Sequence, residues 1–179
     1  MSQNSNKISL TKLSFYPYVD DNGLIKEDLE GKIGVYAIFN QDKILEYVGY
    51  SRNLLLSLKQ NLVRQPEKCY WFKTYIIERP SRSILEEIKQ SWLSENGAIP
   101  SGNDGEETKW TQPIDAKLSM TQQDKQDYEF SDELGRIKLL KKVSRRVEEE
   151  VKNQLKARHI QFEIRFNPKL KEEGLLDLK

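Results

Sequence analysis

Gly34-Val35-Tyr36-Ala37-Ile38-Phe39 and Ile44-Leu45-Glu46-Tyr47-Val48-Gly49 are two β-prone runs that flank the turn residues 40–43. This pattern predicts an antiparallel hairpin. Tyr36 and Tyr47 then lie on neighbouring strands, where cross-strand partners are about 5 Å apart, so the two phenols can line one pocket. Gly34 and Gly49 leave room there for close approach of another group to the backbone.

The residues after the hairpin predict two helices with one further strand between them. Leucines at helical spacing favour a helix over 53–64 with Asn53 as its N-cap, and the aromatic and β-branched run 69–77 reads as a strand. A second amphipathic helix is expected over 81–95, where Asn96-Gly97 stops it. The order β-β-α-β-α predicts an α/β (α+β) fold with a small central antiparallel sheet flanked by helices.

Taken together, these segments resemble the GIY-YIG nuclease family. That family opens with the two tripeptides Gly34-Val35-Tyr36 and Tyr47-Val48-Gly49, here with their tyrosines 11 positions apart, followed by a turn like Ser51-Arg52-Asn53-Leu54 and a helix. Ile84-Leu85-Glu86 resembles the step that carries the family's metal-binding glutamate, and Pro100-Ser101-Gly102-Asn103 resembles its closing element. The resemblance covers about residues 30–103.

The resemblance implies metal-dependent hydrolysis of phosphodiester bonds in DNA, with Mg²⁺ or Mn²⁺ as the cofactor of an active enzyme. Tyr36 would act as general base or orient the attacking water, and Tyr47 would position the phosphate. Glu86 would bind the metal ion, with Glu87 as its rival one position along the helix. The implied phosphate-binding and structural motif positions are Gly34, Gly49 and Asn103.

One position departs from the family pattern. The arginine that members usually carry eight positions beyond the second glycine is replaced by Ser57, which cannot supply a charged, planar phosphate-binding fork. Arg52 is the first candidate to replace it, and Arg64 is the second. The alternative to an endonuclease is therefore a degenerate domain that binds nucleic acid or a protein partner without cutting.

The rest of the chain predicts three further segments. Residues 1–30 form an N-terminal lead-in to the nuclease-like domain 31–103, and the polar composition of 104–130 indicates a linker or loop. Residues 131–179 form a C-terminal helical extension, with a long helix over 131–156 and an alternating run at 161–166 that favours a strand.

The predicted long helix suggests two kinds of partner. Its apolar stripe, from Leu140 to Leu155, indicates a core contact or self-association of two chains. Its basic side chains recur at intervals of three and four residues, so they lie on one face of the helix and could contact the backbone of a nucleic acid, with DNA expected rather than RNA. A polar helix face in contact with solvent explains these side chains as well. These basic residues are Lys138, Lys141, Lys142, Arg145 and Arg146.

Composition excludes several classes of protein. The 179 residues are 37% hydrophobic and 32% charged, and no run approaches the roughly 18 apolar residues of a membrane span. The polar start lacks a signal-peptide core, so we expect a soluble, cytoplasmic protein. A single cysteine, Cys69, excludes an internal disulfide. The net charge of +1 gives no general attraction to polyanions, although residues 130–179 contain thirteen basic and nine acidic side chains.

Overall fold

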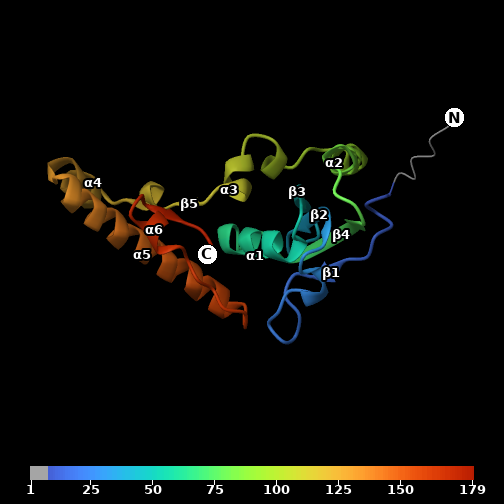
Figure 1. Ribbon diagram of the computed structural model, residues 1–179, viewed down its shortest axis with the longest axis horizontal. Helices are drawn as coiled ribbons and strands as arrows, with labels where there is room; N and C mark the ends of the chain where they lie inside the picture. The colour runs from blue at the N-terminus through green and yellow to red at the C-terminus, as the bar shows by residue number, and fades with distance from the viewer. Residues whose placement is uncertain (1–7) are drawn as a thin grey trace. The chain divides into compact units, whose positions relative to one another are not determined.

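The computed structural model describes residues 8–179, which form two compact units (Figure 1). The first unit ends at Trp110, and the second comprises Thr111–Lys179. Of the predicted lead-in 1–30, the first seven residues lie outside the described part of the chain. The rest of the lead-in contributes a short edge strand, β1 (Tyr16–Pro17), and a 3-10 turn, η1 (Glu27–Leu29).

The first unit is built on a four-stranded antiparallel sheet in the order β1-β4-β2-β3. The predicted hairpin is present as β2 (Ile33–Phe39) and β3 (Leu45–Ser51), and β4 (Trp71–Ile77) pairs with the other side of β2. Tyr36 lies opposite Gly49, and Ile38 lies opposite Tyr47. With helices on the sheet and a long C-terminal helix, this confirms the predicted fold class.

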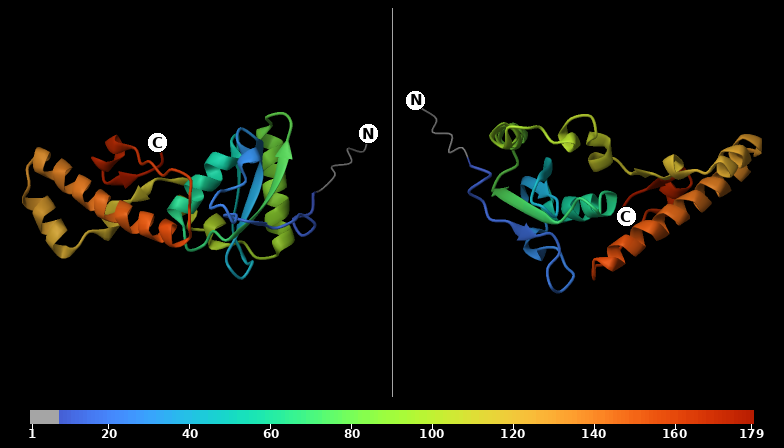
Figure 2. Two further views of the ribbon diagram at one scale, coloured as in Figure 1. Left: turned by 90° about the horizontal axis from the view of Figure 1, so that it is seen from below. Right: turned by 180° about the vertical axis from the view of Figure 1, so that it is seen from behind.

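The two helices of this unit pack against opposite faces of the sheet (Figure 2). On one face, α2 (Arg82–Asn96) buries Leu85, Trp92 and Leu93 against alternate strand residues such as Val35 and Ala37. Strand side chains alternate between faces, so Tyr36 points the other way, toward α1 (Leu54–Arg64). Asn53 and Ser81 cap the two helices through their side chains, as the sequence predicts for Asn53.

The segment 104–130, predicted as a loop, contains regular structure instead. After the 3-10 turn η2 (Ser101–Asn103) come α3 (Glu107–Thr111), β5 (Ile114–Asp115), the 3-10 turn η3 (Ala116–Ser119) and α4 (Gln122–Phe130). Hydrogen bonds between polar side chains and the nearby backbone explain why a helix forms in this polar segment. Thr121 and Asp124 form a reciprocal capping box that starts α4, a helix with almost no apolar face for periodicity to reveal.

The second unit is organised around α5 (Glu133–Ala157), which confirms the predicted long helix. Its apolar stripe is buried against η3, α4, the short helix α6 (Pro168–Lys171) and β6 (Leu175–Leu176), which pairs with β5. These elements already cover the stripe, so it supplies little free apolar surface for a second copy. The strand predicted over 161–166 does not form, because pairing is confined to the end of the run, where Phe166 makes an isolated bridge to Leu178 and the Arg165 carbonyl accepts from the Lys179 N–H.

Candidate functional site

The two tyrosines of the hairpin do meet, but inside the protein core. The side chains of Tyr36 and Tyr47 are 5% and 6% exposed, and their ring centroids are 6.1 Å apart. The Asn61 amide of α1 donates a hydrogen bond to the Tyr36 hydroxyl at 2.9 Å. The Tyr47 ring stacks on Trp110, with centroids 5.1 Å apart and the planes within 5°.

Burial makes both phenols poor bases. It raises the pKa of Tyr36 far above its usual range, and the adjacent Tyr47 raises it further, against the weaker lowering effect of the Asn61 hydrogen bond. Burial also raises the pKa of Tyr47, although Arg64 nearby partly opposes this. Arg64 is anchored by donating to the Trp110 carbonyl at 2.8 Å. The tyrosine pair therefore remains protonated near neutral pH.

Glu86, the predicted metal ligand, is on α2 and so lies on the other side of the sheet from the tyrosine pair. Its carboxylate accepts a hydrogen bond from Gln90 at 2.9 Å, and this bond, together with one from Tyr50, lowers the pKa of Glu86. Its rival Glu87 is exposed on the same helix. Residues 8–179 contain no group of three or more His, Cys, Asp or Glu side chains that could hold a metal ion. The structure therefore does not bring Glu86 together with Tyr36 and Tyr47.

The remaining motif residues occupy structural positions. Asn103 makes two hydrogen bonds with Val48 of β3, accepting from its N–H at 2.8 Å and donating to its carbonyl at 2.9 Å. Ser57 donates to the Ser51 hydroxyl at 2.6 Å, which steadies the turn between β3 and α1. Gly34 and Gly49 lie where an added Cβ would meet Tyr75 and the two tyrosine rings, respectively.

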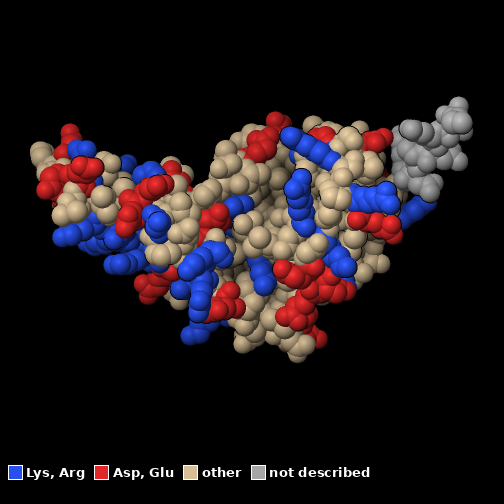
Figure 3. Space-filling model, viewed as in Figure 1, with Lys and Arg blue, Asp and Glu red and all other residues tan. Residues whose placement is uncertain are grey.

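The basic residues of α5 do not form a single free patch. Arg146 forms a 2.6 Å ion pair with Asp124, and Lys141 pairs with Glu172 at 3.2 Å. Figure 3 shows Lys and Arg side chains interspersed with acidic ones on the face it presents. The exposed members of the predicted set are Lys138, Lys142 and Arg145.

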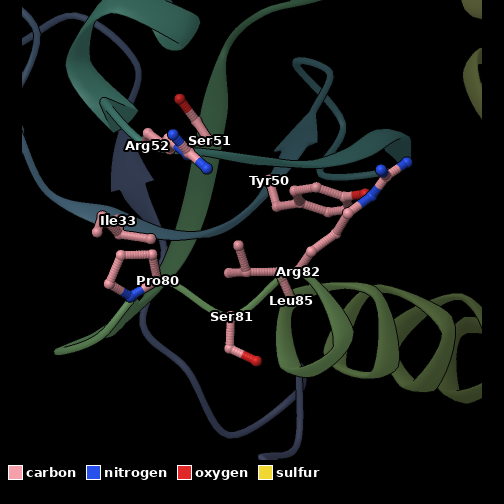
Figure 4. A pocket seen from close by; sticks show the side chains of 8 residues that line it. All are labelled: Ile33, Tyr50, Ser51, Arg52, Pro80, Ser81, Arg82 and Leu85. Atoms are coloured by element: carbon pink, nitrogen blue, oxygen red, sulfur yellow. The ribbon is translucent and has the colours of Figure 1, made fainter.

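A pocket of about 270 Å³ opens on the α2 side of the sheet, near the start of that helix (Figure 4). Of the predicted site residues, only Arg52 lines it. Apolar side chains and two serines form much of its wall, and Figure 4 shows Arg82 passing the hydroxyl end of the Tyr50 ring, with its guanidinium group beyond that ring. The lining residues are Ile33, Tyr50, Ser51, Arg52, Pro80, Ser81, Arg82 and Leu85.

The charges around this pocket are mainly positive. Arg52 and Arg82 are exposed, and within residues 8–179 neither has an ion pair. The ammonium group of Lys89 lies 5.8 Å from the centre of the Tyr50 ring, and Glu86 is the acidic neighbour of that tyrosine. Sequence reasoning missed Tyr50, Ser81 and Arg82. Two features of the sequence could have pointed to these residues: the tyrosine directly after Gly49 and the N-cap position of Ser81.

Comparison with known proteins gives one informative similarity. Over 99 residues, the chain is 30% identical to a protein from Arabidopsis thaliana described as bifunctional monothiol glutaredoxin-S16, chloroplastic. The match covers 53% of this chain and 32% of the relative, so the chain spans about a third of the length of that protein. No protein-family model matches the chain.

These findings contradict the predicted GIY-YIG family and its endonuclease function. The similar protein is described as a glutaredoxin and not as a nuclease or hydrolase, and it lends no better support to a degenerate binding module. The sequence prediction was wrong because it relied on short motifs. The structure explains their glycines and tyrosines by close strand packing and a buried aromatic pair, without catalysis.

None of the helices in residues 8–179 combines the length and apolar character needed to cross a membrane. The relative is described as chloroplastic, which does not support the predicted cytoplasmic location.

Proposed function

We propose that the first unit binds a small anionic ligand in the pocket lined by Arg52 and Arg82. The observation that carries this proposal is that two arginines from different elements line one pocket and that neither forms an ion pair within residues 8–179, although the Glu86 carboxylate is close enough to interact electrostatically with Arg82. Guanidinium groups bind phosphate and carboxylate through paired, charge-assisted hydrogen bonds. The hydroxyl groups of Ser51 and Ser81 add further hydrogen-bonding capacity at the same pocket.

The lining also favours a planar or apolar part in the ligand. Ile33, Pro80 and Leu85 supply apolar surface, and Tyr50 supplies an aromatic face. Ligand sites typically combine such walls with a few polar groups that fix orientation. The volume of about 270 Å³ suits a compact molecule. Phenyl phosphate, which joins a phosphate to a single ring, therefore represents the proposed ligand class.

Titration with phenyl phosphate tests the proposal. We expect it to shift the amide NMR signals of Ser51, Arg52 and Arg82, and to bind more tightly than inorganic phosphate because its ring gains contact with Tyr50. Replacing Arg52 or Arg82 by alanine should weaken binding roughly tenfold or more, since a hydrogen bond to a charged group contributes about 1.5–3 kcal/mol.

Arg79→Ala is the matched control. Arg79 is exposed, lies close to α2 in the sequence and does not line the pocket, so the loss of its charge should leave affinity nearly unchanged. Phenol, which has the ring without the phosphate, should not bind measurably. Equal weakening by all three arginine substitutions would indicate general charge attraction and refute a specific site.

Thiol redox chemistry is a second candidate, favoured by the glutaredoxin description of the relative. In this chain it would have to use Cys69, the single cysteine. That side chain is 0% exposed, and its thiol lies 3.6 Å from the Asn61 carbonyl oxygen as a hydrogen-bond donor. Reactive cysteines are at least partly exposed and lie in electropositive surroundings, whereas buried ones are inert. The environment of Cys69 therefore favours a packing role.

Reaction with a chromogenic disulfide reagent distinguishes the two candidates. We expect Cys69 in the folded protein to react at least a hundredfold more slowly than in the protein unfolded by urea, because reaction requires the core to open. Cys69→Ala should retain phenyl phosphate binding. Reaction of the native thiol at the rate of a free cysteine would instead support redox chemistry on this chain.

We further propose an intracellular setting for the protein. The chain has a single cysteine, Cys69, and cannot form a disulfide within itself, as is usual for proteins of reducing compartments. Partition of the tagged protein between cytosol and organelles would test this, and secretion would contradict it.

A further inference from the structure

The second unit has a pocket of its own, between the long helix α5 and the short helix α6, which lies beside it (Figure 1). The pocket has a volume of about 180 Å³. Four of its lining residues are basic, one is acidic and none is aromatic. They are Lys141, Arg145, Pro168, Lys169, Lys171 and Glu172, here called the α5–α6 pocket. Apart from the proline, its wall is made of charged side chains.

Contacts between the two helices fix the walls of this pocket. Lys171 of α6 forms a 2.8 Å ion pair with Glu148 of α5, and the two side chains are only 17% and 14% exposed. The buried Ser144 hydroxyl donates to the Lys171 carbonyl at 3.2 Å. Across the pocket, Lys141 pairs with Glu172 at 3.2 Å. A ligand would therefore meet groups that are already held in place, which lowers the entropic cost of binding.

Arg145 and Lys169 supply positive charge that no acidic group balances. Arg145 lies one helical turn beyond Lys141 on the same side of α5, and Lys169 lines the pocket from α6. Both side chains are exposed, and neither forms an ion pair within residues 8–179. The Arg145 guanidinium can donate paired hydrogen bonds to phosphate oxygens, and the Lys169 ammonium adds a second, more mobile charge. The pocket therefore favours a ligand with more than one negative charge.

We propose that the α5–α6 pocket binds a small phosphate-containing polyanion without an aromatic ring, such as a diphosphate group. Its negative charge would be matched by Arg145 and Lys169, and the absence of aromatic lining gives a ring nothing to stack on. The Glu172 carboxylate would oppose binding, because it repels the ligand and holds Lys141 in an ion pair. The site lies wholly within the second unit and does not depend on the anion pocket proposed for the first.

Titration of the full-length chain with inorganic pyrophosphate, followed by amide NMR, tests the proposal. The signals of Lys169 and Lys171 should report this site, and those of Ser51 and Arg52 report any binding to the first unit separately. Arg145→Gln should weaken binding at the α5–α6 pocket roughly tenfold or more, because it removes charge-assisted hydrogen bonds. Lys142→Gln is the matched control: it removes one positive charge from an exposed position of α5 that does not line the pocket, and affinity should hardly change.

A pair of acidic substitutions tests the same site in the opposite direction. Glu172→Gln should strengthen pyrophosphate binding about fivefold, because it removes a repelling charge and frees Lys141. Glu173→Gln removes the same charge from the exposed neighbour, which does not line the pocket, and should have little effect. Equal effects of Arg145→Gln and Lys142→Gln, or of the two glutamate substitutions, would show general charge attraction and overturn the proposal.

Two other results would also overturn it. The first is the absence of pyrophosphate-dependent shifts at Lys169 and Lys171. The second is tighter binding of a short single-stranded oligonucleotide than of pyrophosphate, with shifts spread along the whole of α5, because the surface would then serve an extended polyanion and not a small one.

Discussion

Replacing Gly34 by alanine is expected to destabilise the first unit by about 3 kcal/mol or more, the upper range for overpacking a core. A Cβ at this position would overlap the carbonyl oxygen of Tyr75 on the neighbouring strand and lie 3.1 Å from the Cα of Ile76. Both atoms belong to the backbone of β4, so no side-chain rotation can relieve the clash. Urea unfolding followed by tryptophan fluorescence would measure the loss, since all three tryptophans lie in this unit.

A double substitution separates this explanation from ordinary side-chain crowding. Ile76 pairs with Gly34 across the ladder and is 43% exposed, so Ile76→Ala alone should cost little. Combined with Gly34→Ala, it should restore no stability, because the clash involves the backbone and not the isoleucine side chain. Recovery of stability in the double variant would show that the glycine is required for a different reason.

Arg146→Met is expected to destabilise the second unit by about 2 kcal/mol. Arg146 joins α5 to α4 through its 2.6 Å ion pair with Asp124 and also donates to the Ser119 carbonyl at 3.1 Å. Asp124 is only 5% exposed, so loss of its partner leaves a largely buried carboxylate with weaker compensation. Arg145→Met removes the same charge from an exposed position and should have almost no effect. Urea unfolding followed by the amide NMR signals of α5 would compare the two.

Acid should remove the difference between wild type and Arg146→Met. The Arg146 guanidinium lowers the pKa of Asp124 from 3.8 to about 2, with help from its hydrogen bonds with Thr121. A folded-state pKa below the unfolded value gives stability that is present above about pH 4 and is lost as the pH falls toward 2. The two proteins should therefore converge in stability over this range. A difference that stays constant down to pH 2 would contradict the assigned role of the pair.

Much of the fold was predictable because its signals are local. The β-prone runs on either side of residues 40–43 produce the hairpin, and the leucine spacing after Asn53 produces α1 with that residue as its cap. The helix α4 was not predicted, because it has no apolar stripe and its start is fixed by hydrogen bonds within its first turn. The run 161–166 alternates between apolar and polar residues as a strand does, but a strand also needs a partner strand, and this run makes only an isolated bridge.

The site was less predictable because it depends on which face of the sheet each side chain occupies. Tyr36 and Glu86 seemed to belong to one pocket, but α1 and α2 cover opposite faces and keep them apart. Arg146 seemed available for a ligand, whereas its contact with Asp124 spans 22 positions of sequence. The sequence alone does not show which basic side chains are already paired with other groups in the folded protein.

The side chain of Asn103 has a consequence for solubility. As the last strand in the order, β3 presents an outer row of backbone groups, and such edges can recruit strands from other molecules into aggregates. The Asn103 amide occupies both polar groups of Val48 on that edge, as a strand of one residue would. An incoming strand would have to displace it before pairing in register. We therefore expect the Asn103 side chain to hinder aggregation, because it occupies the backbone groups at the middle of this edge.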